Sequence, residues 1–179
     1  ERRGWLSFRG SQDDVLDRYY QAARARDADV VVRVTSDCPL IAPEIVDRVV
    51  GELAAAGGEL DYVCNVVAPR TYPRGLDVEA IPFAILEQAW TEATDSPCRE
   101  HVTPFIYRNP QRFRIRVVTN DVDYSAKRWT VDTPEDLRLV RLIYDAFGHD
   151  RFSWRDVLAL LAEHPEWEAI NREVQQKPT

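Results

Sequence analysis

Residues 29–41 read DVVVRVTSDCPLI, a valine-rich run that ends in a short polar turn. The apolar part, residues 30–34 (VVVRV), is typical of a strand that is buried on both faces of a parallel sheet. Asp37 lies in the turn after this strand, and ligands of open α/β sheets bind beyond the carboxyl ends of the strands. Asp37 is therefore a candidate functional residue. An alternative is that Asp37 only caps the turn before Pro39.

Strand and helix patterns alternate along the whole chain. Apolar residues at helical spacing predict helices over residues 11–25, 43–56, 82–90, 99–107 and 133–147, and shorter helices that begin at Ser153 and Pro165. Strands are predicted over residues 1–9, 61–67, 113–119 and 128–131. We expect one α/β domain over residues 1–179, a three-layer sandwich with a mostly parallel, Rossmann-like sheet. The alternating segment 76–81 (LDVEAI) could add an antiparallel piece with Asp77 and Glu79 on one face.

Composition excludes several classes of protein. The 179 residues are 45% hydrophobic, which is enough for one real core, and the net charge of −7 argues against nucleic acid or an anionic membrane as the main partner. No apolar run approaches the roughly 20 residues that span a bilayer, so a soluble cytoplasmic protein is expected. Three scattered cysteines support neither a disulfide framework nor a zinc site, and Cys38 is expected to be a packed thiol rather than a nucleophile. Because there is no methionine, we expect a piece of a longer protein.

Two carboxylates follow predicted strands and precede helix starts. Asp37 is the first, and Asp132 in the segment WTVDTPED is the second. If both lie at one rim of the sheet, their oxygens suit Mg²⁺, which takes one or two protein carboxylates and completes its shell with water and substrate phosphates. For Asp132 the alternative is that it only satisfies the free N–H groups at the start of the next helix.

Basic side chains form a second candidate group that could meet a carboxylate or phosphate of a substrate. These residues, with one histidine, are Arg70, Arg74, Arg99, His101, Lys127 and Arg128. The alternative for each of them is a solvated surface charge. No dinucleotide, P-loop, nucleophile-elbow or zinc-protease motif occurs in the sequence.

Four blocks of sequence together resemble the cytidylyltransferase superfamily. They are RVTSDCPLIAPEIVD, RTYPRGLDVEAI, REHVTPFIYRNP and RWTVDTPEDLRLV, in that order. The resemblance is to the spore-coat-polysaccharide type of nucleotidyltransferase, which is related to the CMP-KDO and CMP-sialic acid synthetases. It covers nearly the whole chain, and four ordered blocks are more specific than any one of them.

The resemblance implies roles for particular residues. In the family, aspartates at the positions of Asp37 and Asp132 bind the catalytic Mg²⁺, and the RGLDVE and REHVTP blocks line the acceptor side of the cleft. The implied acceptor-side residues are Arg74, Asp77, Glu79, Arg99 and His101, and Lys127 is a further candidate for substrate binding. The chain departs from the family in lacking the N-terminal strand and basic glycine-containing loop that hold CTP, so it corresponds to the C-terminal part of such a domain.

The function that the resemblance implies is Mg²⁺-dependent transfer of CMP from CTP to an acidic sugar or another anionic acceptor, with release of pyrophosphate. A nucleotide-sugar glycosyltransferase is a competing enzyme class, because it also holds a metal against a diphosphate. A non-catalytic binding or assembly module of a larger biosynthetic protein is a third hypothesis, and it is motivated by the missing nucleotide loop. Family relatives are commonly dimers, so a homodimer is also expected.

Overall fold

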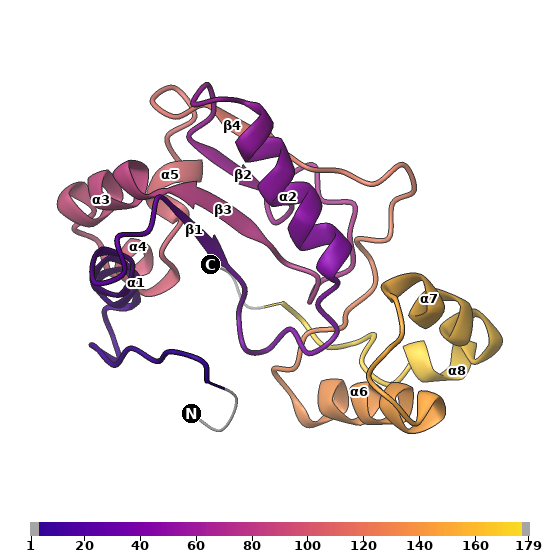
Figure 1. Ribbon diagram of the computed structural model, residues 1–179. Helices are drawn as coiled ribbons and strands as arrows, with labels where there is room; N and C mark the ends of the chain where they lie inside the picture. The colour runs from indigo at the N-terminus through magenta and orange to yellow at the C-terminus, as the bar shows by residue number, and fades with distance from the viewer. Residues whose placement is uncertain (1–3, 177–179) are drawn as a thin grey trace.

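The structure is a computed structural model that describes residues 4–176, and it has a mixed α/β fold (Figure 1). The strands are β1 (Val30–Arg33), β2 (Tyr62–Cys64), β3 (Glu79–Pro82) and β4 (Ile115–Val117). The helices are α1 (Val15–Arg24), α2 (Pro43–Ala55), α3 (Phe83–Glu92), α4 (Ser96–His101), α5 (Pro104–Tyr107), α6 (Pro134–Phe147), α7 (Trp154–Glu163) and α8 (Pro165–Glu168). None of these helices has the length and apolarity that crossing a membrane requires.

The described strands form one sheet in the order β1-β3-β2-β4. Strand β3 pairs antiparallel with both β1 and β2, while β2 and β4 are parallel. The prediction of a mostly parallel sheet is therefore wrong, and the sheet is mixed. The reason is the segment LDVEAI, whose alternating pattern does give the antiparallel strand β3. This strand is inserted between β1 and β2 instead of lying at the edge of a parallel sheet.

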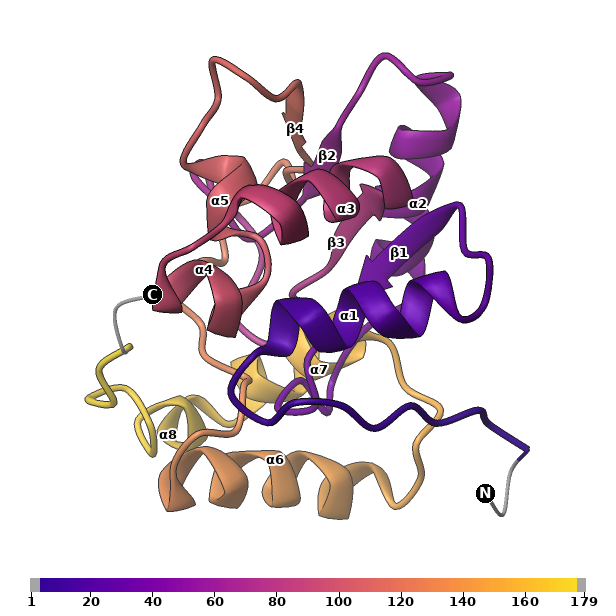
Figure 2. The same ribbon diagram turned by 90° about the vertical axis from the view of Figure 1, so that its left-hand side faces the viewer.

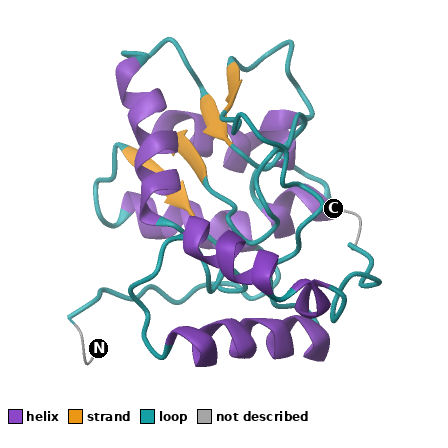
Figure 3. Cartoon of the chain, turned by 90° about the vertical axis from the view of Figure 1, so that its right-hand side faces the viewer, coloured by secondary structure: helices purple, strands orange, loops and turns teal. Residues whose placement is uncertain are grey.

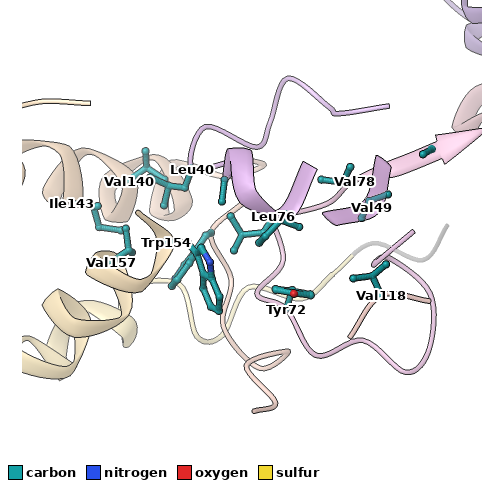
Figure 4. Packing of buried hydrophobic residues seen from close by; sticks show 14 of the residues in the cluster. Leu40, Val49, Tyr72, Leu76, Val78, Val118, Val140, Ile143, Trp154 and Val157 are labelled. Carbon is teal, nitrogen blue, oxygen red and sulfur yellow. The ribbon is translucent and has the colours of Figure 1, made fainter. Parts of the chain in front are cut away.

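Hydrophobic clusters cover both faces of the sheet, because neighbouring residues of a strand point to opposite sides. Val63 and Ala80 belong to a cluster with α2, α6 and α7, whereas Tyr62 and Ile81 belong to a cluster with α1, α3, α4 and α5. Figures 1 and 2 show α2 on one side of the sheet and α1, α3, α4 and α5 on the other, with α6–α8 beyond the end of the sheet. Figure 4 shows Trp154 of α7 among the buried side chains of the first cluster.

The helix starts follow the polar signals in the sequence. Thr133 caps α6 in a capping box with Asp136, and Ser153 caps α7 in the same way with Asp156. Both helices begin where the sequence predicts. Helix α1 begins slightly later than predicted, at Val15, because Asp14 rather than Ser11 is its N-cap.

Other local predictions are wrong. Of the strand predicted over residues 1–9, residues 4–9 form a loop, and residues 1–3 lie outside the described part of the chain. Residues 128–131 contribute only an isolated bridge between Arg74 and Arg128. The helix predicted over residues 99–107 is split into α4 and α5, because Val102 adopts a positive φ of 74°. Residues 118–133, between β4 and α6, form neither a named helix nor a named strand. Figure 3 shows that loops make up much of the chain around the short strands.

Candidate functional site

Asp37 lies in the turn after β1, and the segment before α6 crosses this turn. The Val131 N–H donates to the Asp37 carbonyl oxygen at 2.9 Å, and the Thr130 hydroxyl donates to Asp37 Oδ2 at 3.1 Å. Asp132 is the next residue after Val131. The structure therefore places the two predicted metal ligands, far apart in sequence, on adjacent segments at one end of the sheet.

The donor set at these two aspartates fits a magnesium ion. Both side chains offer hard carboxylate oxygens; Asp37 is partly buried, and the side chain of Asp132 is 38% exposed. Asp132 Oδ2 accepts a hydrogen bond from Arg128 Nη2 at 2.6 Å. Over residues 4–176 no cluster of three or more acidic, histidine or cysteine side chains gathers to cage a metal. Mg²⁺ usually binds through one or two carboxylates plus water and substrate phosphates, which is what this pair of residues could offer.

The neighbouring thiol is not a nucleophile. Cys38 is buried, and burial raises the pKa of its thiol to about 11. Because the thiolate is the reactive form, Cys38 is inert at neutral pH. This agrees with the packed role that the sequence predicts for it.

A close backbone crossing joins the loop after β2 to the segment before α6. The Arg74 N–H donates to the Lys127 carbonyl at 3.0 Å, and the Trp129 N–H donates to the Arg74 carbonyl at 2.7 Å. Gly75 has a φ of +99°, and a Cβ atom there would lie 2.5 Å from Thr130 N. Only glycine fits at position 75, because the two backbone segments are too close there for a side chain. This close contact holds Arg74 beside the segment that contacts Asp37.

A cavity of about 340 Å³, here called the small cavity, collects four of the predicted acceptor-side residues. These residues are Arg74, Asp77, Glu79 and His101. Its other lining residues include Arg33, Thr35, Arg70, Thr103 and Tyr107. The small cavity lies near the aspartate pair, because Asp77 interacts through its backbone and its charge with Cys38, the residue after Asp37.

Two of the arginines in the small cavity are paired with its carboxylates. Arg33 Nη1 contacts Glu79 Oε2. Arg70 donates from Nη1 to Asp77 Oδ1 at 2.6 Å and from Nη2 to Asp77 Oδ2 at 3.1 Å. Arg74 forms no ion pair within the described part of the chain. Burial and the nearby Arg70 charge lower the pKa of Arg74, although it stays a cation. The small cavity therefore has a surplus of positive charge at Arg74.

Glu79 lines the small cavity but is only 1% exposed. Its Oε2 contacts Arg33, and its Oε1 accepts a hydrogen bond from the Tyr62 hydroxyl. Both carboxylate oxygens are thus used by the protein. The structure gives Glu79 the arrangement of a residue that positions Arg33, whereas the resemblance implies a direct contact with the acceptor.

Two predicted residues lie elsewhere. Lys127 lines a neighbouring larger cavity of about 540 Å³, where its ammonium contacts Glu168, and Arg74 lines this cavity too. Arg99 lines neither cavity, so the structure does not bring it to the other acceptor-side residues. Its guanidinium binds Asp14 Oδ2 at 2.5 and 2.9 Å and thereby ties α4 to α1.

Sequence analysis missed Arg33 and underrated Asp136. Arg33 is the single charged residue in the valine run, at the end of the strand that faces the polar turn, and this position is a usable signal. Asp136 looks like an ordinary capping residue, yet it is fully buried and accepts hydrogen bonds from both Arg128 and Asn171. Nothing in the local sequence indicates this long-range contact.

Comparison with known proteins places the chain in a family. The sequence model of a family described as cytidylyltransferase matches residues 3–147. An uncharacterized protein of Methanocaldococcus jannaschii is 36% identical over 175 residues, which are 95% of this chain and 68% of the relative. The spore coat polysaccharide biosynthesis protein SpsF of Bacillus subtilis is 27% identical over 169 residues, with 92% and 68% of the two chains covered.

Solved structures share the fold. A cytidylyltransferase from Leptospira borgpetersenii matches with a TM-score of 0.89 and 30% identity, covering 99% of this chain and 73% of that one. A CMP:2-keto-3-deoxy-manno-octonic acid synthetase in complex with CTP matches with a TM-score of 0.56 and 16% identity over 79% of this chain and 72% of that one. The family match and the Leptospira structure agree over most of the sequence, and the chain therefore belongs to the cytidylyltransferase family of nucleotidyltransferases.

Proposed function

We propose that the protein transfers CMP from CTP to an acidic sugar or another anionic acceptor, with Mg²⁺ as cofactor and pyrophosphate as the second product. The observation that carries this proposal is the small cavity, whose unpaired Arg74 is held by backbone hydrogen bonds against the segment that contacts Asp37. An anion bound there would lie near the two aspartates. The name of the Bacillus relative and the CTP bound to the synthetase support a sugar acceptor and CTP.

Each group at the site has a task in this reaction. An acceptor oxygen attacks the α-phosphorus of CTP, the new P–O bond forms, and the bond to pyrophosphate breaks. Asp37 and Asp132 would hold Mg²⁺, which neutralises charge on the phosphate oxygens. Thr130 orients Asp37 through its hydroxyl, and Arg128 orients Asp132. Arg74 binds the acceptor anion, so that the attacking oxygen is positioned before the reaction.

A pyrophosphate-release assay tests the proposal. The protein is incubated with Mg²⁺, each of the four nucleoside triphosphates and a panel of acidic sugars; pyrophosphate is expected with CTP and only with an acidic acceptor. Asp37→Asn and Asp132→Asn should each lower kcat/KM by on the order of 10²- to 10³-fold, because each removes charge from the metal site. Asp145→Asn, an equivalent change at an exposed position of α6, should have no effect.

The same assay separates the competing hypotheses. A nucleotide-sugar glycosyltransferase would release a nucleoside diphosphate instead of pyrophosphate, and a binding module would show no turnover with any triphosphate. Full activity in both aspartate variants, or full activity after removal of divalent metal with EDTA, would contradict the proposed mechanism. The expected homodimer stays a prediction, which light scattering of the purified protein can check.

A further inference from the structure

Arg33 has an unsatisfied donor at the wall of the small cavity. Its Nη1 contacts Glu79, but its Nε is buried without a hydrogen-bond partner. A buried donor without a partner costs about 1–3 kcal/mol, so such groups are rare in folded proteins unless water or a ligand satisfies them. Arg33 lines the small cavity, and a ligand oxygen in this cavity could supply the missing acceptor.

The surroundings hold Arg33 in one charged form and one orientation. Burial alone would lower the pKa of Arg33, but the Glu79 charge raises it above its ordinary value. Burial and the same carboxylate raise the pKa of Tyr62 far above its usual range, so Tyr62 stays protonated and donates to Glu79. Tyr19 of α1 also interacts with the Arg33 guanidinium, through its charge and a side-chain hydrogen bond, which leaves Nε as the donor without a partner. The Arg33 guanidinium is therefore held in place by its ion pair with the buried Glu79 carboxylate.

The small cavity therefore offers two arginines of different character. Arg33 is fixed by Glu79, while Arg74 is half-buried and has no carboxylate partner in residues 4–176. We propose that Arg33 binds the anionic group of the acceptor together with Arg74, and that Glu79 is a positioning residue which orients Arg33 for this contact. This inference rests on the proposed function and names the residue that distinguishes acidic from neutral acceptors.

The chemistry of guanidinium groups favours a carboxylate as the bound anion. Arg presents its N–H donors in a planar fork that matches the two oxygens of a carboxylate, and charge-assisted hydrogen bonds are stronger than neutral ones. A neutral carboxamide in the same place would lose the charge interaction and bring its own N–H donors to a cationic site. The protein should therefore strongly prefer the acid to its amide.

Calorimetric titration tests this preference without requiring turnover. The probes are 2-keto-3-deoxy-manno-octonic acid, N-acetylneuraminic acid and glucuronic acid, each compared with its own carboxamide. The wild-type protein should bind at least one free acid about 10- to 100-fold more tightly than the carboxamide. Arg33→Gln should reduce this ratio to below about 3-fold, whereas Arg141→Gln, the same change at an exposed position of α6, should leave it unchanged.

Two further variants separate binding from folding. Arg33→Lys keeps a positive charge for Glu79 but lacks the planar fork of donors, so it should fold normally and bind the acid about 3- to 10-fold more weakly, while the acid stays preferred to the carboxamide. Glu79→Gln keeps the size of the side chain and removes the charge, so it should raise the acceptor KM by about 3- to 10-fold through poorer orientation of Arg33, with the KM for CTP unchanged. Circular dichroism confirms the fold of each variant.

The outcomes distinguish this inference from the proposed function. A folded Arg33→Gln variant that keeps the wild-type preference, or a folded Arg33→Lys variant that binds the acid as tightly as the wild type, overturns the role of Arg33, even if the enzyme releases pyrophosphate. A wild-type protein that binds acid and carboxamide equally, or binds none of the probes, also overturns it. If the preference is present and depends on Arg33 but no pyrophosphate is released, the proposed transfer fails and the binding role of Arg33 stands.

Discussion

Two buried arginine–carboxylate pairs lie near the candidate site, and they differ in how completely they are satisfied. In the pair of Arg128 and Asp136, all three arginine side-chain nitrogens donate hydrogen bonds, and the carboxylate accepts five. In the pair of Arg33 and Glu79, the arginine Nε is buried without a hydrogen-bond partner, and both residues line the small cavity.

The difference indicates what each pair does. Every side-chain nitrogen of Arg128 and both carboxylate oxygens of Asp136 have partners within the protein, which indicates a structural role for this pair: it joins the segment before α6 to Asn171 and Gln176 near the C-terminus. A network with one buried donor left over has capacity to bind an acceptor group. The largest expected effects of mutation on stability therefore concern Asp136, and the clearest effects on recognition concern Arg33.

Removal of Asp136 should cause the greatest loss of stability. Asp136→Ala leaves Arg128 buried without its main partner, and breaking a buried ion pair in this way costs about 3–5 kcal/mol. Urea denaturation measures the free energy of unfolding. Asp156→Ala is the matched control, because Asp156 has the same place in the capping box of α7 but is exposed, and it should cost about 1 kcal/mol. Equal losses in the two variants would contradict the structural role of the Arg128 pair.

Gly75 lies where the loop after β2 approaches the segment before α6, and its close contact with residues 129–130 holds Arg74 of the small cavity beside Arg128. In Gly75→Ala the added Cβ would collide with backbone and adopt an unfavourable φ, so we expect a loss of about 3 kcal/mol and weaker acceptor binding. Gly58→Ala also places a Cβ at a positive φ, of 93°, but with no atom within 4 Å. The free energy of unfolding of Gly58→Ala should fall by only about 1 kcal/mol. A similar fall in both variants would contradict the close contact between Gly75 and residues 129–130.

The Arg128 pair should also make stability depend on pH. Burial alone would raise the pKa of Asp136, but hydrogen bonds from Arg128 and Asn171 hold it at about 2. Because this value is below the ordinary value of about 3.8, the stabilisation is complete above pH 4 and is lost as the pH falls toward 2. The stability difference between wild type and Asp136→Asn should therefore shrink by on the order of 2 kcal/mol between pH 5 and pH 2. A constant difference would contradict the lowered pKa.

The sequence predicts the elements of this fold better than their arrangement. The capping boxes at Thr133 and Ser153 are local signals, and both helices begin there. The direction of the strands is not local: β3 is antiparallel because of where it is inserted in the sheet, and no residue of LDVEAI encodes its neighbours. The split of the helix at Val102 likewise depends on tertiary packing, since a valine with positive φ is unfavourable by itself.

For the candidate site, sequence reasoning locates residues but not their roles. Asp37 and Asp132 are found from their places after strands, and the structure brings their segments together. Glu79 is also found, yet its two oxygens are occupied by Arg33 and Tyr62, which are 46 and 17 residues away in the chain. Contacts over such separations depend on the whole fold, so the pairing of Glu79 with Arg33 and Tyr62 could not be predicted from the local sequence.

The hydrogen bond from Tyr62 to Glu79 is the second contact that holds the Glu79 carboxylate in the Arg33 pair. Tyr62→Phe removes the hydroxyl that donates to Glu79, and hydrogen bonds to charged groups contribute about 1.5–3 kcal/mol. We expect a stability loss near the lower value, since Arg33 still holds the other carboxylate oxygen, together with a rise of about 2- to 5-fold in the acceptor KM. Steady-state kinetics and urea denaturation measure the two effects. A change in stability with no change in acceptor KM would mean that Arg33 needs no support from Tyr62.

The smallest effect is expected at Arg99, which is a third kind of arginine: partly exposed, paired with Asp14, and distant from both cavities. Arg99→Gln should cost about 1 kcal/mol, because a partly exposed ion pair is screened by water and the Trp90 carbonyl can be solvated. The acceptor KM should not change, in contrast to Arg33→Gln. If Arg99→Gln instead raised the acceptor KM as much as Arg33→Gln does, α4 would have to move on substrate binding, and a satisfied arginine would no longer indicate a structural role in this protein.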